Sequence, residues 1–117
     1  MLTSKEIAHL AVKALDDKLA RDIQILKTDK VTVLADYFIL CTAGNSTHGK
    51  TLADEVDKVL SQGGEQPLRR EGYRSGGWTL LDFGCVVVHI FSEEMRSFYS
   101  LDRLWSDAEK IDYKDFL

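Results

Sequence analysis

Residues 85–91 form the longest apolar stretch of the chain, a run rich in β-branched side chains that is interrupted by His89. Such a run has no polar face, which is typical of a central β-strand covered on both sides. Residues 78–83 form a second apolar stretch, and Gly84, which can adopt a positive φ, lies in the turn between the two. The pattern therefore predicts two antiparallel strands, residues 78–83 and 85–91, at the centre of the fold.

Apolar residues at helical spacing predict helices on both sides of these strands in the sequence. Residues 4–20 carry one apolar stripe and begin beside a Thr-x-x-Glu capping box. Residues 47–61 form a second amphipathic stretch, which ends at two glycines. Ser92 can cap a third helix, because the acidic residues after it are favourable in a first helical turn. Ser100 is a candidate restart of that helix.

Three further segments complete the predicted sheet. Residues 22–26 alternate between apolar and polar side chains, and residues 35–42 are more continuously apolar. Residues 67–71 suit an edge strand, because a proline is tolerated there. The resulting order, αββαβββα, predicts an α+β (α/β) fold. It is a single domain, residues 1–117, in which helices pack on a mixed sheet of about five strands.

The same pattern gives an expected core and an expected end of the ordered chain. The core should contain apolar residues from both halves of the chain: Ile39, Val56, Leu80, Val86, Val88, Ile90 and Phe98. Residues 108–117 are charged, with scattered aromatic side chains, and we expect them to form a frayed tail.

Composition and charge limit the kinds of partner. A chain of 117 residues with 44% hydrophobic and 29% charged residues is typical of one globular domain. It has no apolar stretch long enough for a membrane span and no apolar leader, and its two cysteines fall inside expected strands. We therefore expect a cytoplasmic protein with reduced cysteines. The net charge of −4 disfavours binding to nucleic-acid phosphates and favours a basic protein partner.

One motif supports an alternative function. Residues 44–51, Gly-Asn-Ser-Thr-His-Gly-Lys-Thr, fit the phosphate-binding pattern G-x-x-x-x-G-K-[ST] between a strand and a helix. In such a loop the backbone amides hold phosphates, the lysine reaches the terminal phosphates and the hydroxyl holds Mg²⁺. The alternative is therefore a small nucleotide-binding protein or NTPase. Against it, strands joined by tight turns cannot form the doubly wound parallel sheet of an NTPase.

No other set of residues indicates catalysis or metal binding. His9, His48 and His89 lie in different expected elements without metal-ligand spacing, and the two cysteines are far apart in the sequence. The nucleophile motif G-x-S-x-G is absent from the sequence. We therefore expect no enzyme activity, no cofactor and no metal. We expect His89 to make a structural hydrogen bond inside or beside the sheet.

Trp78 is the main candidate for a binding residue. It follows Gly77 at the entrance of an expected strand, close in sequence to Tyr73 and Arg74. Aromatic residues and arginines are over-represented in the hot spots of protein interfaces. A tryptophan that merely closes the edge of the core would give the same pattern. Both interpretations stay open on the sequence.

Several short motifs occur together in a distinctive order. They are Asp36-Tyr-Phe-Ile-Leu40, Gly44-Asn-Ser46, Glu71-Gly72, Trp78-Thr-Leu-Leu-Asp-Phe-Gly84, Val86-Val-Val-His-Ile-Phe91, Arg96, Tyr99-Ser-Leu101 and Leu104-Trp105. The ordered set resembles the ribosomal silencing factor family, also called Iojap-like proteins, over nearly the whole chain. Two positions depart from the family pattern: His48-Gly49-Lys50 creates the phosphate-loop match, and Cys85 stands where an acidic residue is common.

The resemblance implies a nucleotidyltransferase-like fold without the active site, in a cytoplasmic protein that is often a homodimer. It implies a translational repressor that binds the large ribosomal subunit through ribosomal protein L fourteen and blocks joining of the small subunit when nutrients are scarce. No direct DNA binding and no membrane association are expected. The partner-binding residues implied by the family are Tyr73, Trp78, Leu81 and Asp82, together with Tyr99 and Trp105.

Overall fold

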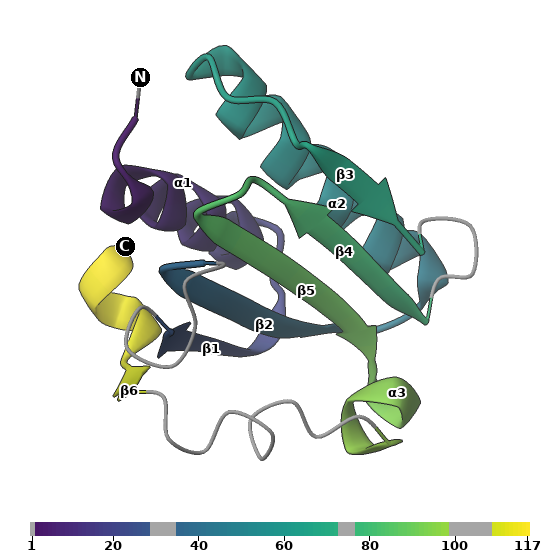
Figure 1. Ribbon diagram of the computed structural model, residues 1–117. Helices are drawn as coiled ribbons and strands as arrows, with labels where there is room; N and C mark the ends of the chain where they lie inside the picture. The colour runs from purple at the N-terminus through teal and green to yellow at the C-terminus, as the bar shows by residue number, and fades with distance from the viewer. Residues whose placement is uncertain (1, 29–34, 73–76, 99–108) are drawn as a thin grey trace.

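A six-stranded sheet forms the centre of the molecule (Figure 1). The computed structural model describes residues 2–28, 35–72, 77–98 and 109–117, and for residues 96–98 only the backbone. The strands lie in the order β3-β4-β5-β2-β1-β6. Their bounds are β1 Arg21–Lys27, β2 Tyr37–Ala43, β3 Arg69–Glu71, β4 Trp78–Asp82, β5 Val86–Ser92 and β6 Glu109–Ile111. The helices are α1 Ser4–Asp17, α2 Ser46–Gln62 and α3 Glu93–Phe98, followed by the 3₁₀ turn η1 Tyr113–Phe116.

The sheet is mixed, as the sequence predicted. β2 runs parallel to β5, and every other pair of neighbouring strands is antiparallel. β4 and β5 form the predicted antiparallel pair across a tight turn, in which the Phe83 N–H donates to the Val86 carbonyl at 2.9 Å. Gly84 has a φ of 86° in this turn, which is the conformation that glycine adopts without strain. The prediction of central strands at these positions is therefore confirmed.

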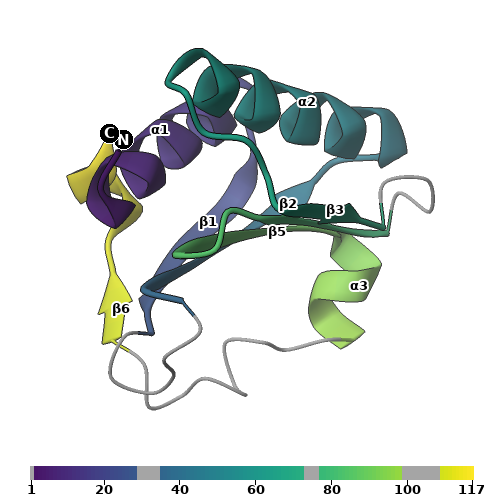
Figure 2. The same cartoon turned by 45° about the horizontal axis from the view of Figure 1, so that its top comes forward.

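The two faces of the sheet are covered by different numbers of helices. Helices α1 and α2 cover one face, and α3 lies on the other (Figure 2). The larger core lies under α1 and α2, and it contains five of the predicted core residues, each at most 2% exposed: Ile39, Val56, Val86, Val88 and Ile90. A smaller buried cluster on the opposite face consists of Leu26, Leu40 and Phe91, with Met95 of α3 packed against it. The central strand β5 is thus covered on both faces at its Phe91 end.

Side chains cap the starts of α1 and α2, and the cap of α1 is the predicted capping box. At the start of α1, the Thr3 hydroxyl accepts the Glu6 N–H at 3.1 Å and the Glu6 carboxylate accepts the Thr3 N–H at 3.0 Å, which completes the capping box. At the start of α2, the Asn45 side chain accepts the His48 N–H at 2.8 Å. This N-cap starts α2 at Ser46, one residue before the predicted position.

The C-terminal residues differ from the prediction of a frayed tail. β6 pairs with β1 and forms the sixth strand, and η1 follows it. Phe116 is only 6% exposed and makes an edge contact with Tyr37, with a distance of 5.6 Å between the ring centroids. The charged residues of the tail face solvent, whereas Phe116 is buried and Tyr113 packs partly buried against the same core. These two rings and the pairing of β6 with β1 hold the segment in place.

Candidate protein-binding surface

The alternation of side chains along β4 decides which of its residues can meet a partner. Thr79 and Leu81 are buried toward α1 and α2, whereas Trp78, Leu80 and Asp82 are partly exposed on the opposite side. We call this side of the sheet the Trp78 face. Trp78 and Asp82 lie on it together, as a common contact surface requires.

Leu81 is the one described residue whose predicted role conflicts with its position. Its side chain is 0% exposed and belongs to the core under α1 and α2, so it is not available for a direct contact. Leu80 takes the outward position instead, because a strand turns successive side chains to opposite faces. Leu80 was predicted to be a core residue, and that prediction was wrong for the same reason. Of the other predicted contacts, Tyr73, Tyr99 and Trp105 lie outside the described residues.

Trp78 is held in place by the neighbouring strand β5. The register pairs Trp78 with Phe91 and Leu80 with His89, which brings three rings together on the Trp78 face. The indole stacks on Phe91 with ring centroids 5.2 Å apart and an angle of 28° between the planes. Its Nε1–H donates to Nδ1 of His89 at 3.2 Å, which confirms the predicted structural hydrogen bond of this histidine. The ring is therefore fixed on one side and partly exposed on the other.

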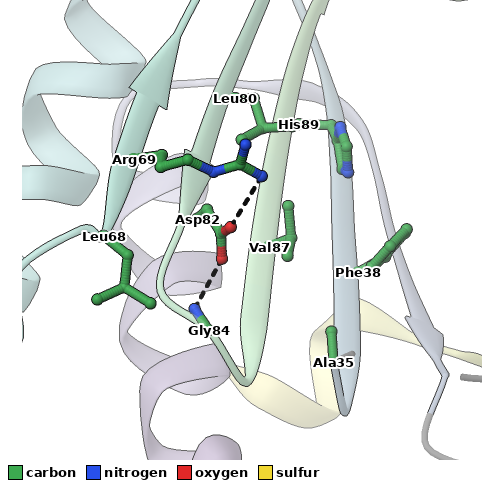
Figure 3. Close-up of a pocket in the computed structure, with 9 residues that line it drawn as sticks. All are labelled: Ala35, Phe38, Leu68, Arg69, Leu80, Asp82, Gly84, Val87 and His89. Carbon is green, nitrogen blue, oxygen red and sulfur yellow. Dashed lines mark hydrogen bonds and ion pairs between the residues drawn. The ribbon is translucent and has the colours of Figure 1, made fainter. Parts of the chain in front are cut away.

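A pocket of about 310 Å³ lies beside these rings on the Trp78 face (Figure 3). It is lined by residues from the four strands β2, β3, β4 and β5 and from the segments that flank them: Ala35, Phe38, Leu68, Arg69, Leu80, Asp82, Gly84, Val87 and His89. The Asp82 carboxylate accepts the Gly84 N–H at 2.8 Å and pairs with Arg69 of β3 at 3.3 Å. The Arg69–Asp82 pair thus lies on one side of the pocket, His89 lines it from β5, and most of the remaining lining is apolar.

A second, smaller pocket of about 210 Å³ lies at the other end of β4 and is lined by Glu71, Gly72, Trp78 and Leu80. Leu80 lines both pockets, so they lie on either side of its side chain. Leu68, which also lines the first pocket, is 73% exposed. The Trp78 face therefore presents apolar side chains at two pockets along β3 and β4.

His89 is the most unusual side chain of this face. It is 4% exposed, and burial lowers its pKa to about 4, although the nearby charge of Asp82 opposes the shift. The imidazole is therefore neutral near pH 7. Because Nδ1 accepts the Trp78 N–H, the remaining proton belongs on Nε2. That nitrogen is buried and has no hydrogen-bond partner among the described residues.

Arg70 shows how β3 is placed beside β4. Its guanidinium points to the helix side of the sheet, where it donates to Asp54 at 2.7 Å and to Asp57 at 2.8 Å, both on α2. The preceding residue, Arg69, points to the Trp78 face and reaches Asp82. Alternating arginines therefore join β3 to a helix on one side and to the candidate surface on the other.

In the segment that matches the phosphate-loop pattern, side chains of the same segment accept hydrogen bonds from two backbone amides. The Gly44 N–H donates to Nδ1 of His48 at 2.8 Å, and the His48 N–H donates to the side chain of Asn45 at 2.8 Å. Nε2 of His48 lies 2.7 Å from the carbonyl oxygen of Lys18. A phosphate loop directs amides of this kind at its ligand, whereas here two of them bind protein atoms. The nucleotide-binding alternative thus finds no support in this geometry.

Two further features are absent from residues 2–28, 35–72, 77–98 and 109–117. Within those ranges, no group of three or more histidine, cysteine, aspartate or glutamate side chains is placed to hold a metal ion. Over the same part of the chain, no helix has the length and apolar character needed to cross a membrane.

Sequence reasoning missed two members of this surface. Leu80 could have been found from the period of two along a strand, but apolar residues occupy both faces of β4 and hide that period. The contact between Trp78 and His89 follows from the register of β4 on β5, which the short turn at Gly84 determines. The signal was therefore present in the length of the turn rather than in any motif.

The fold and this surface define a small α+β protein with a partly exposed aromatic sheet face. The family model described as Ribosomal silencing factor during starvation matches residues 1–117. The chain therefore belongs to the ribosomal silencing factor family, which confirms the resemblance found in its motifs. Membership gives it a ribosome-associated role in silencing translation.

Individual relatives agree with this assignment. The chain is 35% identical to Ribosomal silencing factor RsfS of Halalkalibacterium halodurans over 111 residues, which cover 95% of both chains. It is 36% identical to the RsfS of Bacillus subtilis over 111 residues, covering 95% of this chain and 94% of the relative. A crystal structure of a Chromobacterium violaceum protein superposes with a TM-score of 0.87 at 36% identity, covering 90% of this chain and 88% of the other.

Proposed function

We propose that the chain silences translation by binding the large ribosomal subunit through ribosomal protein L fourteen and thereby blocking the joining of the small subunit. The contact surface in this proposal is the Trp78 face, with Trp78 and Asp82 as described contact residues. Tyr73, Tyr99 and Trp105 are further candidates outside the described residues. Family membership supports the ribosome as the partner, and the proposal adds the ribosomal protein and the mode of action.

The observation that carries the proposal is the position of two partly exposed apolar side chains at pockets of the Trp78 face. Trp78 and Leu80 are both partly exposed, and each lines a pocket of the Trp78 face. Hot spots in protein interfaces combine aromatic anchors with pockets from which water can be displaced. A partner that covers this surface would bury apolar area that is now in contact with water, and that burial favours binding.

The charge of the chain agrees with a basic partner. Its net charge is −4, and ribosomal proteins commonly carry an excess of basic residues because they contact RNA phosphates. Asp82 is already paired with Arg69 in the free chain, so its carboxylate is not a fully available charge. Affinity in this proposal therefore comes mainly from Trp78 and the pockets, and long-range charge mainly increases the association rate.

Binding rather than catalysis is the proposed activity. The amides of Gly44 and His48 are used within the protein, and the described residues hold no candidate metal centre. The family belongs to ribosome-associated regulators. We propose that the protein acts in the cytoplasm without a cofactor. We also propose that the free protein is a homodimer, which sedimentation equilibrium of the purified chain would test.

The deciding experiment is sedimentation of the purified protein with separated ribosomal subunits. The protein should travel with the large subunit and not with the small one, and Trp78→Ala should reduce the bound fraction. Leu117→Ala is a matched control, because it also truncates an exposed apolar side chain (49% exposed) but lies at the C-terminus, outside the lining of both pockets. Sedimentation with the small subunit, or equal binding by both variants, would count against the proposal.

Two further assays test the binding to ribosomal protein L fourteen and the block of subunit joining. Purified ribosomal protein L fourteen should bind the chain directly and should compete with the large subunit for it. Light scattering of mixed subunits should show slower or incomplete joining when the chain is added first. Binding to the large subunit without an effect on joining would retain the partner and reject the blocking mechanism.

A further inference from the structure

His89 occupies a position where a histidine is costly. It lies on β5, a strand otherwise rich in valine, isoleucine and phenylalanine, and its side chain is almost fully buried between Phe38, Trp78 and Phe91. Nε2 has no hydrogen-bond partner among the described residues. A leucine or phenylalanine would fill this space without burying an unsatisfied donor. Packing alone therefore gives no reason for a histidine at this position.

The interaction that distinguishes His89 from an apolar residue is its bond to Trp78. Nδ1 accepts the indole Nε1–H at 3.2 Å, and the two rings, with centroids 6.0 Å apart, are inclined by 36°. Both rings also stack on Phe91, at 28° for Trp78 and 7° for His89. Phe91 supports the indole from one side, and the hydrogen bond fixes the direction of its N–H. Together these contacts select one orientation of a ring that is otherwise partly exposed.

We propose that His89 is a positioning residue, which holds the indole of Trp78 in its binding orientation through the lone pair of Nδ1. That this orientation serves binding to the large ribosomal subunit rests on the proposed function. Preorganisation of an aromatic side chain improves affinity because the cost of ordering that side chain is met before the partner arrives. His89 therefore acts through Trp78 and is not itself a contact residue.

The proposal requires a neutral imidazole whose Nδ1 carries no proton. Burial provides this state near pH 7, and the acceptor role of Nδ1 selects the tautomer protonated at Nε2. Asparagine places its side-chain oxygen near the position of Nδ1, so His89→Asn retains an acceptor. His89→Leu removes the acceptor and retains an apolar side chain. These two variants separate the hydrogen bond from the bulk of the ring.

The test uses the full chain in two assays. The first is fluorescence of Trp78 in a Trp105→Phe background, since the chain has two tryptophans. His89→Leu should change the emission maximum and lower the anisotropy of Trp78, and His89→Asn should restore both toward the parent. The second is large-subunit binding, where His89→Leu should bind roughly three- to tenfold more weakly, with a melting temperature equal to or above that of the parent.

A double-mutant cycle makes the assignment specific. Trp78→Phe keeps a ring but removes the donor, so in that background His89→Leu should cause no further loss of binding. An equal loss in both backgrounds would overturn the proposal, because His89 would then act independently of Trp78. Unchanged Trp78 fluorescence in His89→Leu would also overturn it. If fluorescence changes as expected but no variant alters subunit binding, the positioning role stands and the proposed binding surface fails.

Discussion

A Cβ atom on Gly72 would overlap the backbone carbonyl oxygen of Trp78. Gly72 follows β3, and its φ of 76° lies in the region that favours glycine. Both the lack of space for a Cβ atom and the positive φ therefore favour glycine at this position, where the chain leaves β3 beside the first residue of β4. The close approach of these two backbones places Trp78 at the entrance of its strand, next to the smaller pocket that Gly72 also lines.

Gly72→Ala should consequently destabilise the fold and weaken large-subunit binding. The positive φ alone costs an alanine about 1–2 kcal/mol, and the overlap with the Trp78 carbonyl adds to this cost. Gly64→Ala is the matched control, because Gly64 has a φ of 90° but no atom within 4 Å of the added Cβ. Urea unfolding should show a clearly larger loss for Gly72→Ala. Equal losses in the two variants would mean that the close approach to Trp78 has no structural effect.

Val88→Asp should unfold the domain. Val88 is 0% exposed in the core under α1 and α2, where a carboxylate would have neither water nor a cation, at a cost of several kcal/mol. The control is Val87→Asp, since Val87 is the preceding residue on β5 but is partly exposed on the Trp78 face. Circular dichroism melts should show loss of the transition for Val88→Asp and a smaller shift for Val87→Asp. A normal melting temperature for Val88→Asp would contradict the central position of β5.

The sequence predicted those parts of the fold that depend on residues close to one another along the chain. The run around Val88 and the turn at Gly84 specify two adjacent strands and their register, because a tight turn leaves little choice of pairing. The capping box at Thr3 specifies the start of α1 in the same local way. The pairing of β6 with β1, in contrast, joins segments far apart in the sequence, and nothing local in a charged three-residue strand indicates it.

In the candidate site, too, the features set by a local motif were predicted and those set by packing were not. Trp78 and Asp82 were predicted from their motif, and the structure places both on one face. Leu80 and Leu81 were interchanged, because adjacent leucines give no indication of which face is buried. The role of His89 depends on a cross-strand contact to Trp78, and its burial depends on rings from two other strands. Such properties arise from packing and cannot be assigned from the type of residue alone.

Stability should fall on acidification because of His89. Its pKa is lowered to about 4 in the folded protein, whereas an unfolded histidine titrates near 6.5. Between these values the unfolded state binds the extra proton, so stability is fully present above pH 6.5 and declines as the pH falls toward 4. At about 1.4 kcal/mol per pH unit, the loss is on the order of 3 kcal/mol. Urea midpoints from pH 7 to pH 4 should show a shallower decline in His89→Leu; identical pH profiles would contradict the prediction.

Lys50→Ala should leave the activity of the protein unchanged. Lys50 is the lysine of the phosphate-loop pattern, but the Gly44 and His48 amides of that segment bind protein atoms. Purified protein should not hydrolyse ATP or GTP in the presence of Mg²⁺, and Lys50→Ala should bind the large subunit almost as the parent does. Nucleotide turnover that disappears in Lys50→Ala would revive the NTPase alternative and would falsify the absence of catalysis.

Trp78→Ala separates the two interpretations of this residue. As a hot spot, Trp78 should contribute at least about 2 kcal/mol to large-subunit binding, or roughly thirtyfold in affinity. As a core residue, its truncation should cost about 3–5 kcal/mol of stability and reduce binding only through unfolding. The ring is partly exposed, although it stacks on Phe91 and bonds to His89. We therefore expect a moderate loss of stability, below about 3 kcal/mol, together with a large loss of affinity.

Both quantities must be measured on the same preparation of Trp78→Ala. Binding is compared at a temperature where thermal melts show the variant to be folded, so that unfolding does not contribute to the loss of affinity. Asp82→Asn provides a second contrast on the same face. Because it removes charge but little contact area, it should change mainly the association rate and its dependence on salt. A folded Trp78→Ala variant that binds the large subunit like the parent would remove Trp78 from the contact surface, whatever the effect of Asp82→Asn.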